Sequence, residues 1–342
     1  MNERLGLYNL EGKISKNLFK KYGLFPDSFI LNSLKEELGA IENAGREEEI
    51  IILYNFINWL KEERIPYWLR GTAGSSSLFY LLGITRGNPL PAHSYCPKCK
   101  SLGWLDNYHS GFDMEETLQC EKDGSRLVTD GHNIPWKSLW GYEDNKIVFT
   151  IDLPIESYDR IRKFWEDYQY HILKEENLLE IREEFMGLRF LNIDCVFTIE
   201  EVNSNFYEKD LNIDKALKFF DLDELPRPQK FSDLLYGLGL NNSTGAWTEK
   251  TRYMVENLGM SLSDMIAFRE DIYFYLLEHN FCLEEAWLGA NSFRRPDPFF
   301  EITEEMDYAA DKWKLAICQD IKYLFPKAND LEYIIFRMKN HN

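Results

Sequence analysis

Apolar side chains recur at helical spacing in several stretches of the chain, and this pattern predicts a fold rich in helix. The clearest stretch lies between the acidic run at 47–49 and the charged end at 61–64, where apolar residues stand three or four positions apart. That spacing places them on one face, which we expect to be buried. The same periodicity predicts further helices over residues 157–188, 231–238, 248–257, 262–278 and 307–324.

Two other stretches have the features of strands and turns. Residues 70–90, RGTAGSSSLFYLLGITRGNPL, open with a glycine-serine turn that runs into an apolar stretch, which predicts a strand, a tight loop and a helix. Residues 146–153, KIVFTIDL, have the β-branched and aromatic content of a strand. The sequence between these two stretches is polar, shows no regular apolar periodicity and contains three cysteines. We therefore expect an insertion there, over residues 93–135.

These elements predict an α+β chain with a boundary near its middle. Residues 221–230, DLDELPRPQK, contain two prolines and no apolar periodicity, which is typical of a linker. We therefore expect a helical lead-in over 1–69, a mixed domain over 70–220 with the insertion inside it, and a helical domain over 231–342.

Composition and charge narrow the classes of function. The chain has 342 residues, with 57 acidic against 39 basic side chains and a net charge of −18. Binding nucleic acid irrespective of sequence depends on Lys and Arg neutralising phosphates, so this charge disfavours it except at a locally basic face. No apolar run approaches the roughly 20 residues of a membrane helix, and the start of the chain has no apolar signal core, so we expect a cytoplasmic protein without a membrane partner.

The cysteine spacing in the insertion predicts a structural zinc site. Cys96 and Cys99 form the motif CPKC, Cys120 follows after twenty intervening residues, and Asp123 stands where a fourth cysteine would complete a second C-x-x-C. This is the spacing of a zinc ribbon, in which two short turns each offer two ligands to a tetrahedral ion. The competitors for the fourth position are His93 and His109. The alternative is three reduced surface cysteines left from a lost site.

The segment RGTAGSS, residues 70–76, is a candidate phosphate cradle. Its glycines permit close approach of the backbone, and a following helix start presents free N–H groups. The alternative is that the turn only caps the helix.

The strand over 146–153 carries the candidate catalytic carboxylate. Thr150 and Asp152 lie on one face of it, because strand side chains alternate. Two-metal phosphoryl or nucleotidyl transfer needs several carboxylates converging on two ions about 4 Å apart. Glu184, in REEFMGLR, is a candidate for a further acid. An isolated acid in a strand or a charged helix is more often only solvated, so this pattern alone leaves catalysis open.

Taken together, these motifs resemble the polymerase core of the PolC-type alpha subunit of bacterial DNA polymerase III, a C-family DNA polymerase. The family pattern of an Arg-Gly-Ser loop, Asn-Pro-Leu-Pro and Cys-x-x-Cys is similar to RGTAGSS and NPLPAHSYCPKC here. SGFD, CEKDG and DGHNIP follow in the family's order, and FSDLLYGLGL, SLSDMIAFREDIYFYLL and DIKYLFPKA resemble its fingers segment. The resemblance covers about residues 34–190 and 230–335, and the cysteine region is its most specific part.

The resemblance implies a palm of the polymerase-beta-like nucleotidyltransferase type with an inserted zinc knuckle, followed by a fingers-like helical domain. It assigns the incoming triphosphate to the glycine-serine loop, with Thr72 replacing the family's first serine. The residues that carry over are Arg70, Gly71, Gly74, Ser75 and Ser76. It also implies DNA contacts from the loop that carries Arg294 and Arg295.

The departures from the family indicate impaired catalysis. The family's Pro-Asp-Ile-Asp-Leu strand reads with Thr150 at its first catalytic aspartate, Asp152 is unchanged, and the third acid falls on Glu184. Loss of a bridging carboxylate removes a ligand from both ions, so Mg²⁺ or Mn²⁺ is expected only if activity survives. After FPKA, the acids Asp330 and Glu332 replace a basic and small pattern, and we expect them to repel phosphates.

Three hypotheses follow. The first is a truncated, degenerate polymerase core that binds a nucleotide or a primer-template end, or regulates replication or a related process through a replication-protein partner. The second is an active minimal nucleotidyltransferase that uses Asp152 and Glu184. The third is a protein-interaction module, which an exposed patch of tryptophans would support; the candidates are Trp136, Trp140 and Trp247.

Overall fold

The computed structural model describes residues 5–114, 118–141, 147–168, 186–191, 212–294 and 313–339. Three helices open the chain: α1 (Leu5–Tyr22), α2 (Ser28–Ala44) and α3 (Glu47–Glu62). α3 confirms the helix expected from the apolar spacing, and its buried side chains lie on one face. α2 begins where the Asp27 carboxylate accepts a hydrogen bond from the Phe29 N–H, and it ends at Gly45 in the left-handed conformation.

A three-stranded sheet shares an apolar core with these helices. Its order is β1 (Trp68–Leu69), β5 (Phe149–Pro154) and β6 (Met186–Leu191), with β5 antiparallel to β1 and parallel to β6. After β1 come a 3₁₀ turn, η1 (Ala73–Ser75), and helix α4 (Ser77–Leu82), so the loop and helix expected within residues 70–90 are confirmed, whereas the strand lies just before that range.

The helix predicted over 157–188 is confirmed at its start and wrong at its end, and residues 169–185 lie outside the described residues. A 3₁₀ turn, η3 (Ile155–Ser157), leads into α6 (Tyr158–Tyr168), whereas residues 186–188 belong to β6. Residues 186–188 form a strand because pairing with β5 sets Met186 opposite Phe149, and both side chains are buried.

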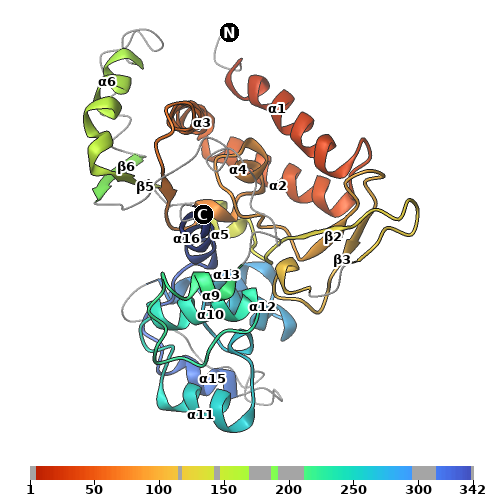
Figure 1. Ribbon diagram of the computed structural model, residues 1–342, viewed down its shortest axis with the longest axis vertical. Helices are drawn as coiled ribbons and strands as arrows, with labels where there is room; N and C mark the ends of the chain where they lie inside the picture. The colour runs from red at the N-terminus through yellow and green to blue at the C-terminus, as the bar shows by residue number, and fades with distance from the viewer. Residues whose placement is uncertain are drawn as a thin grey trace.

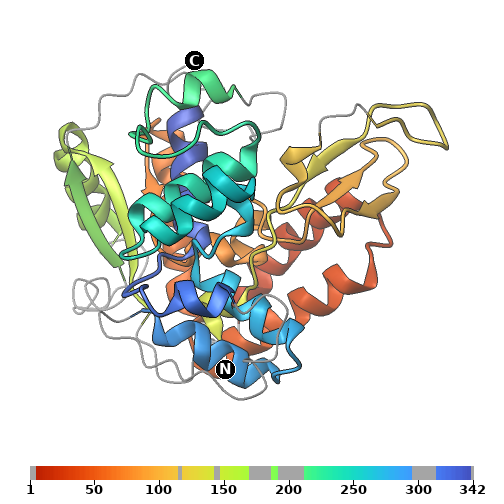
Figure 2. The same cartoon turned by 90° about the horizontal axis from the view of Figure 1, so that it is seen from below.

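The insertion forms a second small sheet. Its strands are β2 (His93–Tyr95), β3 (Leu102–Trp104) and β4 (Val128–Asp130), all antiparallel in the order β3-β2-β4, with the 3₁₀ turn η2 (Gly111–Asp113) between β3 and β4. Three-residue strands are too short to show a period, which is why the sequence looked irregular. Figures 1 and 2 both show this sheet projecting on the side of the molecule opposite α6 and β6.

The second half of the chain is helical, as expected. The helices described there are α9 (Ile213–Ala216), α10 (Phe231–Asn242), α11 (Glu249–Leu258), α12 (Arg269–Glu278), α13 (Leu283–Ser292), α15 (Trp313–Cys318) and α16 (Lys327–Lys339). The single helix predicted over 262–278 is divided into η6 (Leu262–Asp264) and α12. The division falls where Asp271 accepts hydrogen bonds from the N–H groups of Ala267 and Phe268, which begin a new helix.

Each half of the chain has its own apolar core, and α16 contacts elements of both halves. One core draws its buried side chains from residues 10–186, and the other from 216–338 together with Phe112 and Ile134. Helix α5 (Lys137–Trp140) belongs to the first core, and α16 packs against η1 and β1 on one side and α10 on the other. Figure 1 shows α16 at the centre of the molecule, where the halves meet. None of the helices in the described part of the chain is both long and apolar enough to cross a bilayer.

Candidate functional site

A pocket lined by four arginines lies where the sheet β1-β5-β6 meets the second half of the chain. Its volume is about 420 Å³. The arginines are Arg70, Arg189, Arg269 and Arg294, and we call it the arginine pocket. The other lining residues come from the glycine-serine loop, α5, β5 and the loop before α16. Among the described residues that line it, none carries a carboxylate.

Asp152 lies behind this pocket, fixed between two of the arginines. Its side chain is 0% exposed, and its two carboxylate oxygens lie 3.3 Å from Nη1 of Arg70 and 3.3 Å from Nε of Arg189. Strand pairing produces this arrangement, because Asp152 stands opposite Arg189 in β6 while Arg70 follows β1 directly. Burial raises the pKa of Asp152, and the two guanidinium groups act against that rise.

Thr150 stands two residues before Asp152 on the same face of β5 and lines the pocket. Its strand partner is Gly187, so no side chain from β6 faces it across the pair. Glu184, the predicted further acid, lies outside the described residues. The side chains described on this face therefore present one carboxylate that is already paired with arginine.

These residues do not fit a divalent metal site. Mg²⁺ and Mn²⁺ are held by several carboxylate and carbonyl oxygens, whereas both oxygens of Asp152 already face guanidinium groups. Across the ranges that the structure describes, the one group of three or more Cys, His, Asp or Glu side chains close enough to share an ion lies in the insertion and does not include Asp152.

The glycine-serine loop is closed from one side by α16. The Gly71 N–H donates to Oδ1 of Asn329 at 2.9 Å, and Gly71 has a φ of 75°, which favours glycine. A Cβ on Gly74 would come within 3.0 Å of Glu332 Cγ and 3.2 Å of the Ala328 carbonyl oxygen, so a larger residue there would push against α16. The loop's first glycine thus uses its N–H on a protein side chain.

The two serines of this loop hold the fold together. Ser75 donates its hydroxyl to the Thr72 carbonyl, while Ser76 donates to Glu37 and accepts from the Phe79 N–H as the cap of α4. Of the five predicted nucleotide-binding residues, Arg70 and Gly71 line the arginine pocket and the other three do not.

Glu37 is a buried acid that the sequence pattern did not single out. It is 0% exposed and also accepts hydrogen bonds from the Leu78 N–H and the Trp140 indole. Burial raises its pKa to about 7. Its position on a helical apolar face was the only available signal.

The acids of α16 do not face a phosphate site, and the expectation that they repel phosphates is wrong for this structure. Asp330 and Glu332 are both 0% exposed. Asp330 accepts hydrogen bonds from the side-chain amides of Asn242 and Asn329, and burial raises its pKa to about 7. Glu332 accepts from the N–H groups of Arg86 and Gly87, so it fastens α16 to the loop after α4.

Two of the pocket's arginines come from the second half of the chain. Arg294, predicted as a DNA contact, is exposed and lines the pocket, while Arg295 lies outside the described residues. Arg269 is 5% exposed and was not predicted, although it stands in the fingers-like stretch SLSDMIAFREDIYFYLL. That stretch was the signal that could have identified it.

The four predicted metal ligands converge in the insertion. The ligand atoms of Cys96, Cys99, Cys120 and Asp123 all lie within 4.8 Å of one another. Sγ of Cys99 is 3.4 Å from Sγ of Cys120, and Sγ of Cys96 is 3.4 Å from Oδ2 of Asp123. Hydrogen bonds from Ser125 lower the pKa of Asp123 to about 2, so its carboxylate is charged.

The two turns that carry these ligands repeat the same backbone pattern. The Cys96 N–H donates to the Ser101 carbonyl and the Cys120 N–H to the Ser125 carbonyl. Each turn then has a residue with positive φ at its fifth position, 64° at Lys100 and 68° at Gly124. Asp123 therefore occupies the place that Cys99 has in the first turn, which fits two equivalent halves of a zinc knuckle.

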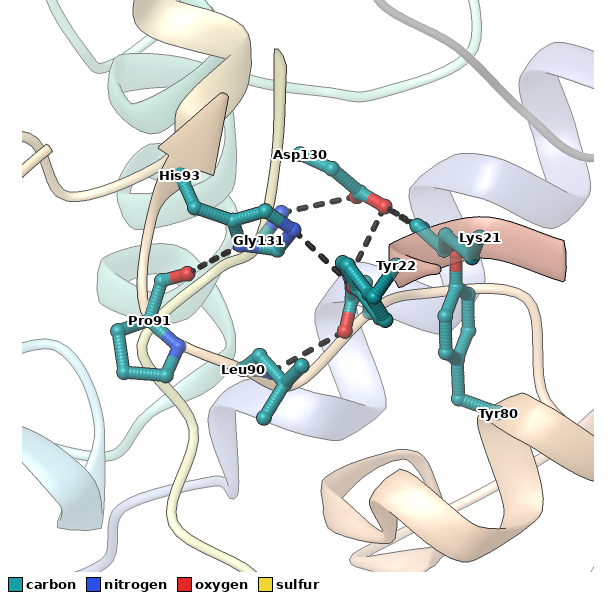
Figure 3. A network of polar contacts seen from close by, with 9 residues as sticks. Lys21, Tyr22, Tyr80, Leu90, Pro91, His93, Asp130 and Gly131 are labelled. Atoms are coloured by element: carbon teal, nitrogen blue, oxygen red, sulfur yellow. Dashed lines mark hydrogen bonds and ion pairs between the residues drawn. The ribbon is translucent and has the colours of Figure 1, made fainter. Parts of the chain in front are cut away.

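Neither histidine competes for the fourth position. Both ring nitrogens of His93 face other groups (Figure 3): its Nε2 lies 3.1 Å from the Tyr22 hydroxyl and its Nδ1 lies 2.7 Å from the Pro91 carbonyl oxygen. His109 stacks edge-on against Tyr236 in the second half of the chain.

The network around His93 anchors the knuckle to α1. Asp130, at the end of β4, accepts hydrogen bonds from the Lys21 ammonium, the Tyr80 hydroxyl and the Asn88 amide (Figure 3). The carboxylate is 10% exposed and the Lys21 side chain 12%. Asp130 therefore ties α1, α4 and the loop that carries Asn88 to the end of β4.

The three candidate tryptophans form no exposed patch, because Trp140 is buried and Trp136 and Trp247 are half-buried. Exposed apolar side chains gather instead at the turn between α1 and α2, which we call the α1–α2 corner. Its members are Phe19, Leu24, Phe25, Phe29 and Leu31, and Phe25 is 95% exposed.

Comparison with known proteins identifies relatives over most of the chain. The profile of the family described as the bacterial DNA polymerase III alpha NTPase domain matches residues 8–184, more than half of the 342 residues. A PolC-type DNA polymerase III of Thermotoga petrophila is 23% identical over 93% of this chain and 32% of its own length, and that of Mycoplasma genitalium is 21% identical over 94% and 31%. The corresponding protein of Thermotoga maritima is 33% identical over 44% of this chain. The chain spans about a third of the length of the relatives that match nearly all of it.

Proposed function

The chain belongs to the family of the bacterial DNA polymerase III alpha NTPase domain, and from that premise we propose that it is a PolC-like palm and fingers homologue with impaired catalysis. In this proposal it binds a nucleotide or the end of a primer-template, and acts in DNA replication or a related process. Its palm comprises residues 70–220 with the knuckle at 93–135, and its fingers comprise 231–342.

The observation that carries the proposal is the pairing of Asp152 with Arg70 and Arg189 beneath the arginine pocket. Four guanidinium groups around one cavity favour a phosphate-bearing ligand. With Thr150 in place of an acid, the same strand lacks the pair of carboxylates that holds two ions for nucleotidyl transfer. The site thus favours binding over catalysis.

Primer extension with Mg²⁺ and then Mn²⁺ tests the loss of activity. The wild type, Asp152→Asn and Thr150→Asp are compared at equal concentration, and we expect no extension by the wild type. Wild-type extension that Asp152→Asn abolishes would overturn the proposal in favour of an active minimal polymerase. Extension by Thr150→Asp alone would identify the missing carboxylate as the cause of inactivity.

For the insertion, we propose a structural zinc ion held by Cys96, Cys99, Cys120 and Asp123. Three thiolates and one carboxylate form a closed tetrahedral set, which suits a structural rather than a catalytic role. The ion would fix the two turns to each other at the tip of a sheet whose strands are only three residues long. Metal analysis of protein purified without chelator tests this, and a zinc content near zero would refute it.

A protein-interaction role is the second candidate, because the α1–α2 corner exposes five large apolar side chains within thirteen consecutive residues, 19–31. A replication protein is the partner class expected from the family. Cross-linking in cells tests this role, with Phe25→Ser as the variant that should lose a specific cross-linked species and Tyr253→Ser, exposed on α11, as the control that should keep it.

A further inference from the structure

We propose that the arginine pocket binds the phosphate groups of its ligand directly through guanidinium groups, without a divalent metal ion. The inference deepens the proposed function and rests on it. It concerns how the site compensates the charge of a nucleotide, which in two-metal sites is the role of the bound ions.

Charge is the first argument. Four arginines line this one cavity in a chain whose overall charge is −18. The described residues that line the pocket contribute no carboxylate, so nothing in that lining attracts a cation. A local positive charge in an acidic protein concentrates anions at this cavity.

Geometry is the second argument. Arg70 donates one of its five N–H groups to one oxygen of Asp152, and Nε of Arg189 forms an ion pair with the other oxygen at 3.3 Å without a hydrogen bond. The remaining donors of these two planar groups stay available for a second anion. Asp152 therefore orients both arginines toward the pocket they line, as a positioning residue rather than as a metal ligand.

The third argument is the contribution of both halves of the chain. Arg70 and Arg189 come from the palm-like sheet, whereas Arg269 begins α12 and Arg294 follows α13. The Gly71 N–H donates to Oδ1 of Asn329 and so is not directed at a phosphate. Side-chain guanidinium groups from two sides are thus the main donors that the described residues present to the cavity.

Fluorescence anisotropy with a labelled deoxyadenosine triphosphate tests the inference on the full chain. One titration uses buffer passed over chelating resin, and the other uses buffer with millimolar Mg²⁺. EDTA is avoided because it would remove zinc from the proposed knuckle site. The zinc content of the protein is measured in both buffers. We expect dissociation constants that agree within about threefold, and a steep loss of affinity with added salt.

Variants locate the binding. Arg189→Gln, at a side chain that is 46% exposed, and Arg269→Gln should each weaken binding about tenfold or more, because each removes charge-assisted hydrogen bonds to the ligand. The control Arg227→Gln alters an exposed arginine paired with Asp214 on the surface and should change nothing. Thr150→Asp should make binding depend on Mg²⁺, because it sets a second carboxylate beside Asp152.

The outcomes separate the two claims. Binding that needs Mg²⁺ in the wild type would overturn metal-free recognition while leaving nucleotide binding intact. Binding in neither buffer would overturn the proposed nucleotide-binding function itself. Equal affinity of Arg189→Gln, folded by circular dichroism, and wild type would show that the ligand does not use this pocket.

Discussion

Replacing Asp152 by Asn should tighten nucleotide binding, although the residue aligns with a catalytic aspartate. The carboxylate lies 3.3 Å from each of two guanidinium groups, so a phosphate on their far side would be roughly 7 Å from it, at the size of a guanidinium. The repulsion between two unit charges at that distance is about 2 kcal/mol at an effective dielectric constant near 20, and solvent at a half-open pocket reduces it to about 1 kcal/mol.

The expected result is therefore about fivefold tighter binding by Asp152→Asn. The amide oxygen of Asn still accepts a hydrogen bond from one arginine, so much of the orientation is kept. The assay is the anisotropy titration in Mg²⁺-free buffer, and the gain should shrink as salt is added because the effect is electrostatic.

A matched control removes an acid elsewhere. Glu166→Gln alters a side chain that is 64% exposed on α6 and paired only with Arg162, so we expect no change in affinity. In a two-metal site, Asp→Asn would instead remove a ligand from the ions and weaken binding of a metal-bound nucleotide. Folded Asp152→Asn that binds several times more weakly in Mg²⁺-free buffer would thus refute our reasoning about this residue.

Three further predictions concern the knuckle and its anchor. Cys120→Ser should reduce bound zinc from near one ion per chain to almost none, whereas Asp123→Cys should retain it against a stronger chelator; mass spectrometry of the metal content measures both. Asp130→Asn should lower the free energy of unfolding in urea by about 3 kcal/mol because it leaves the Lys21 ammonium buried without its charge partner, and adding Lys21→Met should recover part of that loss. Burial lowers the pKa of His93 from 6.5 to about 4, so between these values the unfolded chain takes up a proton that the folded chain does not. The free energy of unfolding should therefore fall as the pH drops through this window, by up to about 3 kcal/mol, and less in His93→Gln.

The sequence was sufficient for features that depend on local pattern. The periodic apolar face of α3, the glycine-serine turn before α4 and the cysteine spacing each predict a structure from residues close together in the chain, and each is found. β6 was missed because charged and aromatic residues before it continue a helical pattern, while its strand conformation depends on pairing with β5, far away in the sequence.

The arginine pairs were beyond the reach of local pattern. Asp152 was visible as a strand acid, but nothing near it in the sequence indicates that Arg70 and Arg189 would hold both of its oxygens. The acids of α16 show the same limit, because Asp330 and Glu332 were expected to face a ligand and instead satisfy groups of neighbouring segments. The sequence showed which side chains are charged. Which group each of them pairs with depends on tertiary packing, which the sequence alone does not show.

The substitutions at β5 and on α16 have a common physical consequence. A palm that binds two cations needs carboxylates directed at the substrate, whereas here Asp152 is paired with arginine and both α16 acids are turned into the protein. The side chain of Asn329 accepts a hydrogen bond from the Gly71 N–H in the glycine-serine loop. Glu332 holds α16, the helix that carries Asn329, in place by accepting a hydrogen bond from the Gly87 N–H. The substitution Thr150→Asp alone would leave α16 in place. A metal site recovered at β5 would therefore still leave the Gly71 N–H of the glycine-serine loop bonded to Asn329 rather than to a phosphate.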